Sequence, residues 1–399
     1  MRCRGPVISG IVLLFGAMAL LGAQTGSRGP SSAPFTIEPL TSPAGANSEA
    51  PQLTVEGDRA ILSWLESHGE HAMLKFAERT VSGWSEVRTV VSGGDLMVNS
   101  ADVPSVRALP GGSLVAEWLQ KGSDPEGYAL RLSWSADAGR TWSPAVSPHR
   151  DNPNAQHGFA SLFPMAAGGF GLVWLDGQET VGMTLRSAEY GADHVKRREL
   201  SVDDRVCECC PTSSALTSDG PIVVYRDRST EEIRDTAVSR LTAAGWSAPA
   251  PVHRDGWKIT GCPVNGPSVS ARGADVAVGW FTVQGGEGRA FVAFSSDAGR
   301  TFGQPIRVND AVAIGRLQIG VLKDRSAAVS WIESMKSGSQ LRVRRIERSG
   351  TRSDAVPVAG GLSSTHPRMV FERDELLFAW TELTQGSTRV RTARSSVVR

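Results

Sequence analysis

Four cysteines beyond the N-terminus are the residues best suited to do chemistry. Cys207, Cys209 and Cys210 form a Cys-x-Cys-Cys segment, and Cys262 follows 52 residues after Cys210. An even number of cysteines suits two disulfides in an oxidising compartment. Because the neighbours Cys209 and Cys210 can bond to each other only with strain, we expect Cys262 to pair with one of the other three. The alternative is a soft-metal site in which the thiolates bind copper or zinc.

Two histidines can complete such a metal site. His157 and His366 each lie where a strand-rich repeat unit begins, and His366 precedes Pro367 as Cys210 precedes Pro211. Neutral imidazole is a ligand for both copper and zinc. The spacing matches no standard zinc ribbon, so disulfides and a metal site both remain open.

A group of charges follows the cysteine segment. Arg226 and Arg228 flank Asp227 in the run Tyr225-Arg226-Asp227-Arg228. Guanidinium groups bind carboxylates and phosphates bidentately, so these arginines, with Arg316 as a third, are candidates to hold an anionic ligand beside the acid Asp227. The alternative is charge pairing at the surface, which contributes little to stability.

Further polar and aromatic residues lie in loops near these charges. Trp257 fits no repeated position in the chain, so its ring is a candidate for stacking on a sugar, with packing over a strand unit as the alternative. Asn265, Asn99 and Asp102 are candidates to bind sugar hydroxyls, or else they cap turns.

These candidates belong to a repeating framework. A short apolar run that ends in an aromatic anchor recurs seven times, at spacings of 54, 56, 51, 55, 51 and 49 residues. The anchors are Trp64, Trp118, Trp174, Tyr225, Trp280, Trp331 and Trp380. Such a fixed period is typical of propellers and other repeat folds.

Each unit predicts four antiparallel strands, because apolar and polar residues alternate between glycine-rich turns and no helical period persists. Seven such units predict an all-β fold, a seven-bladed β-propeller. Six blades with one decorating strand are the alternative. The last unit is one strand short, so we expect residues 35–40 to pair there and close the ring. The candidate residues then lie in loops on one face, at the mouth of the central channel.

Two nearly identical segments carry a recognisable motif. Residues 135–142 and 295–302 both match the pattern Ser-x-Asp-x-Gly-x-Thr-aromatic, called an Asp box. In such a turn the Asp accepts backbone N–H groups, the Gly takes positive φ and the aromatic ring packs between sheets. Its expected structural residues are Ser135, Asp137, Gly139, Thr141, Trp142, Ser295, Asp297, Gly299, Thr301 and Phe302.

With these motifs the chain resembles the sialidase (neuraminidase) superfamily of Asp-box propellers over essentially its whole mature length. The resemblance implies the propeller fold and, if the protein is an enzyme, a glycoside hydrolase of exo-α-sialidase type. The early Arg-Ile-Pro segment of sialidases is replaced by Phe35-Thr36-Ile37-Glu38-Pro39. No sialidase catalytic residue is therefore assigned to this chain, and function depends on the site itself.

The N-terminus predicts export. Arg2 and Arg4 precede an apolar run at 7–21 and then small residues, which is typical of a secretory signal peptide at 1–23. The run is shorter than the roughly 20 residues of a membrane span. Residues 24–34 read as a linker and 35–399 as the propeller, so we expect a secreted or periplasmic monomer with no membrane span in the mature chain.

The amino-acid composition excludes several classes of protein. The chain has 42 Lys and Arg against 41 Asp and Glu, with 40% hydrophobic residues. This excludes disorder, and the balanced charge argues against a nucleic-acid or polybasic membrane surface. Three hypotheses remain: a propeller that binds, or hydrolyses, a glycan or other anionic ligand at the channel mouth; a noncatalytic scaffold with disulfides; and a Cys/His metal-binding propeller.

Overall fold

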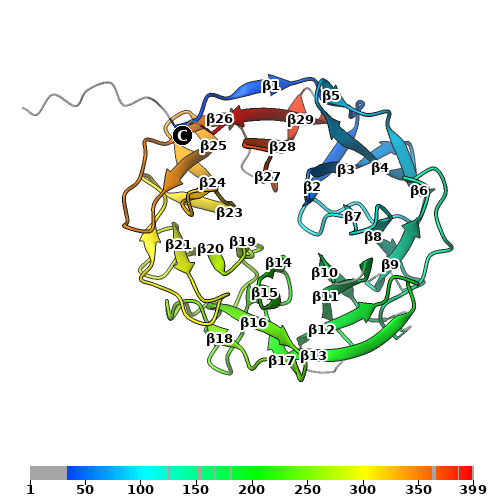
Figure 1. Ribbon diagram of the computed structural model, residues 1–399, viewed down its shortest axis with the longest axis horizontal. Helices are drawn as coiled ribbons and strands as arrows, with labels where there is room; N and C mark the ends of the chain where they lie inside the picture. Colours follow the sequence, from blue (N-terminus) through cyan, green and yellow to red (C-terminus); the bar gives the residue numbers. More distant parts are fainter. Residues whose placement is uncertain are drawn as a thin grey trace, which may run out of the picture. The chain divides into compact units, whose positions relative to one another are not determined.

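The computed structural model describes residues 34–397, except 125, 151, 153, 166–167, 179–181, 362–364 and 385. The predicted signal peptide and all but the last residue of the predicted linker lie outside the described residues. In the described part no helix is long and apolar enough to cross a membrane. Its strands form seven antiparallel sheets arranged as the blades of a ring (Figure 1). The predicted seven-bladed β-propeller is confirmed, and the six-bladed alternative is wrong.

The first four blades follow one another along the chain. Blade 1 contains β2 (Ser48–Glu56), β3 (Arg59–His68), β4 (His71–Thr80), β5 (Gly83–Trp84) and β6 (Arg88–Gly93). Blade 2 contains β7 (Ser105–Ala108), β8 (Leu114–Lys121) and β9 (Tyr128–Ser135). Blade 3 contains β10 (His157–Pro164), β11 (Phe170–Asp176), β12 (Met183–Tyr190) and β13 (Lys196–Val206). Blade 4 contains β14 (Ser213–Thr217), β15 (Gly220–Arg226), β16 (Thr236–Thr242), β17 (Gly245–Trp246) and β18 (Ala250–Pro251).

The remaining three blades complete the ring. Blade 5 contains β19 (Ser268–Arg272), β20 (Asp275–Thr282), β21 (Arg289–Ser295) and β22 (Ile306–Arg307). Blade 6 contains β23 (Ala313–Val321), β24 (Ala327–Met335), β25 (Gly338–Ile346) and β26 (Val356–Gly360). Blade 7 contains β27 (Arg368–Glu372), β28 (Glu375–Thr384) and β29 (Ser387–Ser396), with β1 (Glu38–Leu40) as its outer strand.

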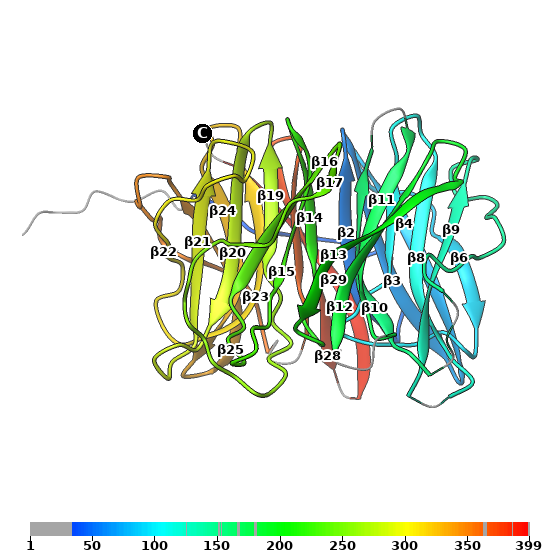
Figure 2. The same cartoon turned by 90° about the horizontal axis from the view of Figure 1, so that it is seen from below.

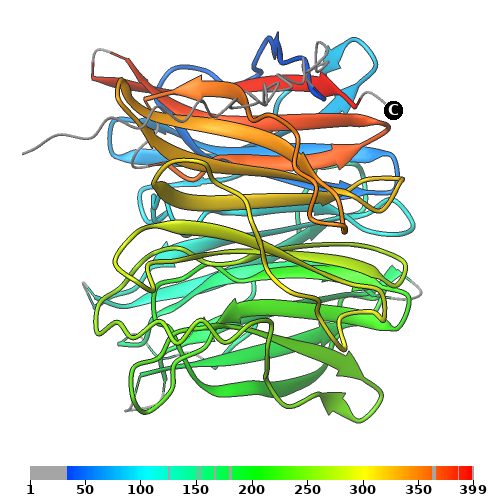
Figure 3. The ribbon, with the colours of Figure 1, turned by 90° about the vertical axis from the view of Figure 1, so that its left-hand side faces the viewer.

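The two ends of the described chain close the ring, as expected. β1 pairs antiparallel with β29, with Glu38 opposite Arg394, and a bridge joins Phe35 to Val397. The blue and red ends therefore lie at one edge of the molecule (Figure 3). This pairing covers the free edge of the last blade, which would otherwise expose unpaired backbone groups.

The aromatic anchors fill the spaces between blades. Trp64, Trp174, Trp280 and Trp331 are fully buried, each in an apolar cluster that joins residues of adjacent blades. Each large aromatic side chain buries 150–250 Å² or so of surface. A single blade would leave both faces of its sheet exposed. Because each anchor packs between two adjacent blades, the regular repeat of anchors along the sequence favours a closed ring of blades.

The two Asp-box segments form the same hydrogen-bonded turn. Asp297 Oδ1 accepts the N–H groups of Arg300 (3.0 Å) and Thr301 (2.9 Å), and Asp297 Oδ2 accepts the Thr301 hydroxyl (2.6 Å). Gly139 of the first segment has φ +81°, and a Cβ there would collide with Phe76. The first turn follows β9 of blade 2, and the second lies between β21 and β22 of blade 5.

Acid should weaken the second of these turns. Burial alone would raise the pKa of Asp297, but hydrogen bonds from Ser295 and Thr301 outweigh it and lower the pKa to about 2. Since the folded-state pKa lies below the ordinary value, the stabilisation is present above about pH 4 and is lost as pH falls towards 2. We expect Asp297→Asn to cost on the order of 1 kcal/mol at neutral pH and less in acid, as measured by urea unfolding.

The first strand of each blade lines a central cavity of about 530 Å³. These inner strands are β2, β7, β10, β14, β19, β23 and β27 (Figure 1). The strands run from one face of the ring to the other (Figure 2). We call the end of the cavity lined by Asp102, Asn265, Arg316, His366 and Arg368 the channel mouth.

Candidate functional site

Three inner strands are distorted at equivalent places. β2, β10 and β23 each contain shifts of register, and there Ala50, Phe159 and Arg316 have φ values of +53°, +50° and +59°. Residues other than glycine rarely adopt this region, and such strain clusters at functional sites. The Phe159 N–H donates to Asp102 Oδ2 (2.7 Å), and the Arg316 N–H donates to Asn265 Oδ1 (2.9 Å). The bulges in β10 and β23 thus fix two polar residues of the mouth.

Acidic and basic side chains from three blades influence one another at this mouth. Blade 2 and the loop that enters it contribute Asp102, Glu117 and Tyr128; blades 6 and 7 contribute Arg316, His366 and Arg368. A Cβ on Gly158 would overlap the Asp102 carboxylate and lie 3.1 Å from the Tyr128 ring. The glycine therefore lets the acid and the phenol ring approach the same stretch of backbone.

Burial favours the protonated forms of Asp102 and Glu117. Burial raises the pKa of Asp102 to about 7, although the Phe159 N–H and the Arg368 charge oppose the shift. Burial and the neighbouring Asp102 also raise the pKa of Glu117 well above its ordinary value. Because like charges repel, the pair ionises in two coupled steps. An acid that titrates near pH 7 can donate or accept a proton at neutral pH.

Among the described residues, Arg316 and Arg368 form no close ion pair, although the charges of Asp102 and Glu117 act on Arg368 from a longer distance. Burial and the Arg316 charge lower the pKa of Arg368 to about 10, while burial and both arginines lower the pKa of His366 to about 3. Within the described residues, Arg316 Nε and Nη1 and Arg368 Nε are buried without a hydrogen-bond acceptor. Arg368 is only 9% exposed. A buried cation normally pairs with an anion, so these groups favour an anionic ligand.

The predicted residues Arg226, Asp227 and Arg228 do not join this group. Arg226 is 1% exposed, and its guanidinium donates to the carbonyl oxygens of Asn265, Arg234 and Phe281. Its role is therefore to hold the loops of blades 4 and 5 together. Arg228 pairs with Glu208 and Glu232.

Asp227 lies beside these charges. Its Oδ1 accepts the N–H of Arg228 (2.6 Å), and burial followed by the Asp203 charge raises its pKa to about 6. The charges that act on Asp227 are those of Asp203 and Asp235, and Arg316 is not among them.

The four predicted ligand-binding residues divide into two groups. Trp257 is 5% exposed, packs edge-on against Phe281 and lies beneath the Arg226 guanidinium at 4.8 Å, so its ring offers no free face to a sugar. Asn99 caps a turn by accepting the N–H groups of Ala101 and Asp102. Asp102 and Asn265 do line the cavity, although both amide ends of Asn265 bind backbone of blade 6.

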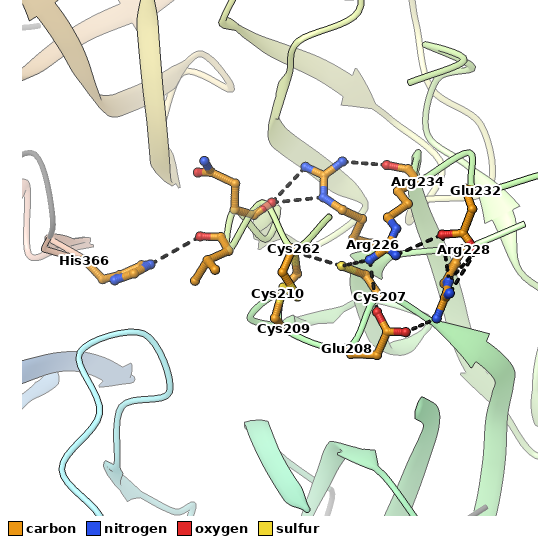
Figure 4. The surroundings of a disulfide bond; sticks show 12 residues. Cys207, Glu208, Cys209, Cys210, Arg226, Arg228, Glu232, Arg234, Cys262 and His366 are labelled. Carbon is orange, nitrogen blue, oxygen red and sulfur yellow. Dashed lines mark hydrogen bonds and ion pairs between the residues drawn. A yellow bond between two sulfur atoms is a disulfide. The ribbon is translucent and has the colours of Figure 1, made fainter. Parts of the chain in front are cut away.

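The cysteines meet where two loops of adjacent blades cross (Figure 4). Cys209 forms a disulfide with Cys262, and their Cα atoms are 5.9 Å apart. Cys207 and Cys210 are thiols with their Sγ atoms 3.3 Å apart. Contact with Cys210 is the main cause that lowers the pKa of Cys207, to about 6, and Arg234 and Arg226 add to it. Burial and the charge of Cys207 raise the pKa of Cys210.

These donors fit a metal poorly as they stand. In the described chain the sulfurs of Cys207, Cys209 and Cys210 lie within 4.8 Å of one another. With Cys209 in a disulfide, two thiols remain, fewer than the four ligands of a structural zinc.

No described histidine completes the set. His366 Nε2 lies 3.4 Å from the Val264 carbonyl oxygen, and the imidazole is set apart from the cysteines in Figure 4. His157 stacks on His149 and lies 3.5 Å from Asp176. Copper or zinc here therefore requires reduction of the disulfide.

Reasoning from the sequence missed Arg368, which lines the mouth, and Glu117, which interacts with it. Glu117 stands one residue before the anchor Trp118, inside the otherwise apolar run 114–119. Arg368 directly follows Pro367, at the first position of an inner strand. A charged residue on a strand expected to be buried was the available signal in both cases.

Comparisons with known proteins agree with the fold. No protein-family model and no curated protein matches the chain. The polysaccharide lyase Uly1 is similar over 88% of this chain and 90% of its own, with a TM-score of 0.56 and 12% identity. The α-L-arabinanase of Penicillium chrysogenum, solved with arabinobiose, matches over 91% and 99%, with a TM-score of 0.53 and 9% identity.

A sialidase is also among the similar structures. The NanB sialidase of Streptococcus pneumoniae matches over 85% of this chain and 83% of its own, with a TM-score of 0.48 and 10% identity. The chain is a seven-bladed β-propeller, and at such identities its likeness to these structures concerns that fold alone.

Proposed function

We propose that this protein binds a carbohydrate bearing a carboxylate at the channel mouth, with Arg316 and Arg368 holding the anionic group. The observation that carries the proposal is the pair of guanidinium groups, buried at the mouth without an acceptor on the buried nitrogens. Arginine binds carboxylates through two parallel hydrogen bonds. A ligand carboxylate would therefore supply a close counter-ion.

The fold supports a carbohydrate as the rest of the ligand. The two similar structures with the higher TM-scores are named as a polysaccharide lyase and an arabinanase. The cavity of about 530 Å³ also falls in the range of small-molecule sites. Asp102 lines the cavity and can hydrogen-bond sugar hydroxyls.

Hydrolysis is a second candidate function, and the position and pKa of Asp102 favour it. An acid that titrates at about pH 7 can protonate the oxygen of a departing sugar. Glycosidases generally need two carboxyl groups, and the second one here is Glu117, which is buried and interacts with Asp102. Turnover of an acidic glycoside that disappears in Asp102→Asn, with binding retained, would distinguish hydrolysis from binding.

The proposed function also includes export of the protein from the cytoplasm. The disulfide between Cys209 and Cys262 suits an oxidising compartment, and the first 23 residues have the pattern of a signal peptide. N-terminal sequencing of the protein recovered outside the cytoplasm should start close to Gln24. A protein that retains Met1 would contradict export by this route.

A glycan array tests the proposed ligand class. Acidic glycans, both uronic and sialic, are compared with neutral glycans of the same size, using the wild-type protein and Arg368→Met. We expect the wild type to bind acidic glycans selectively and the variant to lose that selectivity. Equal binding of neutral glycans, or selectivity kept by the variant, would contradict the proposed site.

Affinity for a carboxylate should fall as pH rises through about 7. Asp102 has a folded-state pKa above its ordinary value, so its ionised form is the disfavoured one and accumulates only above pH 7. Once ionised, Asp102 competes for Arg368 and repels the ligand. We expect affinity to weaken by up to about tenfold per pH unit, and Asp102→Asn to flatten this profile in calorimetric titrations. An identical profile in that variant would remove Asp102 as the titrating group.

A further inference from the structure

A disulfide and two thiols lie close to one another where the loop that enters blade 4 meets the loop that enters blade 5. The sulfurs of Cys207, Cys209 and Cys210 are all within 4.8 Å, and Cys209 is bonded to Cys262. Cys207 and Cys210 have the Cys-x-x-Cys spacing, and their sulfurs are 3.3 Å apart. The next disulfide partner of each thiol is thus already in place (Figure 4).

The disulfide and the thiols differ in their access to solvent. Cys262 is exposed and Cys209 half-buried, whereas Cys207 and Cys210 are 1% and 2% exposed. An external thiol or disulfide can therefore meet the cluster at Cys262 and not at the buried pair.

Arginines surround Cys207 with positive charge. Arg234 Nη1 donates to Cys207 Sγ at 3.3 Å, and this side chain is itself 2% exposed. Arg226 lies close enough to influence both thiols, and among the described residues it hydrogen-bonds only carbonyl oxygens. Glu208 and Glu232 balance Arg234 and Arg228. A thiolate at Cys207 would act as a counter-ion for the buried Arg226, together with the carboxyl group of Asp255.

We propose that the four cysteines form a thiol–disulfide exchange centre, which moves one disulfide between the exposed pair Cys209–Cys262 and the buried pair Cys207–Cys210. In the first step the Cys207 thiolate attacks Cys209 Sγ, the bond to Cys262 breaks, and Cys262 leaves as a thiolate that water protonates. In the second step Cys210 attacks Cys207 Sγ and passes its proton to the departing Cys209 thiolate. Two thiols and one disulfide exist before and after, so no oxidant is consumed.

The exchange gives the four cysteines a function beyond linking the loops of two blades covalently. After the exchange Cys262 is a free, exposed thiol that can react with a small-molecule or protein disulfide. The buried pair Cys207–Cys210 is then the oxidised pair, bonded as a disulfide. The direct path between neighbours Cys209 and Cys210 is disfavoured by ring strain. Cys207 is therefore the required nucleophile.

Peptide mapping tests the exchange without reference to any glycan. The full-length mature protein is treated with limiting phosphine reductant until it contains two thiols per chain. Exchange is then stopped with acid, the thiols are alkylated in denaturant, and the protein is digested with trypsin. Cys207, Cys209 and Cys210 then share the peptide 206–226, and Cys262 lies on 259–272. The exposed disulfide cross-links these peptides, whereas the buried disulfide leaves 259–272 free with alkylated Cys262.

We expect both forms in the wild type. Cys207→Ser should keep the cross-link and reduce alkylated Cys262 by at least about tenfold, because its nucleophile is gone. The matched variant Cys210→Ser should still release Cys262, since it blocks only the second step. Equal Cys262 alkylation in Cys207→Ser and wild type would overturn the proposal. So would a wild type that shows the cross-linked form alone, or thiols that react only after a chelator is added.

Discussion

The Arg316→Met/Arg368→Met double variant should bind an acidic sugar at least about 100-fold more weakly than the wild type. Hydrogen bonds to charged groups contribute roughly 1.5–3 kcal/mol each, and two arginines supply at least two of them. The variant should fold, because it removes buried cations with unpaired nitrogens and keeps their volume. Isothermal titration calorimetry measures the loss.

The control for this experiment is an arginine outside the mouth. Arg197 is exposed and pairs with Asp193 at 2.5 Å, so Arg197→Met should bind as the wild type does. Arg316→Lys/Arg368→Lys keeps the charges but loses the planar fork, and we expect an intermediate affinity. A double methionine variant with wild-type affinity would show that the ligand is held elsewhere.

Removal of the Cys209–Cys262 disulfide should cost about 4 kcal/mol of unfolding free energy. The two residues are 53 positions apart, and the entropy of closing a loop of that length in the unfolded chain gives this figure. The Cys209→Ala/Cys262→Ala variant should therefore unfold at clearly lower urea concentration than the wild type under non-reducing conditions.

A second cysteine pair provides the matched control. Cys207→Ala/Cys210→Ala removes the same number of sulfurs but keeps the tether between blades 4 and 5, so its loss should be much smaller. Equal losses for the two variants would mean that sulfur packing, and not the tether, stabilises these loops.

The fold could be predicted because its signal is repeated along the chain. Each anchor, such as Trp174 or Trp331, fills the same kind of space between blades, so seven weak local patterns combine into one strong one. Closure by β1 followed from the missing outer strand of the last unit. A single blade would have given no such evidence.

The site was harder to predict because position along the chain does not fix where a side chain points. Arg226 and Arg316 are both arginines on blade strands, yet Arg226 turns into the loops and binds carbonyl oxygens, whereas Arg316 lines the cavity. The difference depends on the bulge that gives Arg316 its positive φ. Glu117 and Arg368 were missed because their pairing spans separate blades and leaves no local motif.

One measurement tests the central claim most directly: paired calorimetric titrations of the wild-type protein with an acidic monosaccharide selected on the array and with its methyl ester. The two ligands differ only in the charge and the second acceptor oxygen that the arginines would hold. If Arg316 and Arg368 bind a carboxylate at the channel mouth, the acid should bind at least about 100-fold more tightly than the ester. Equal affinities for the acid and the ester would contradict the account.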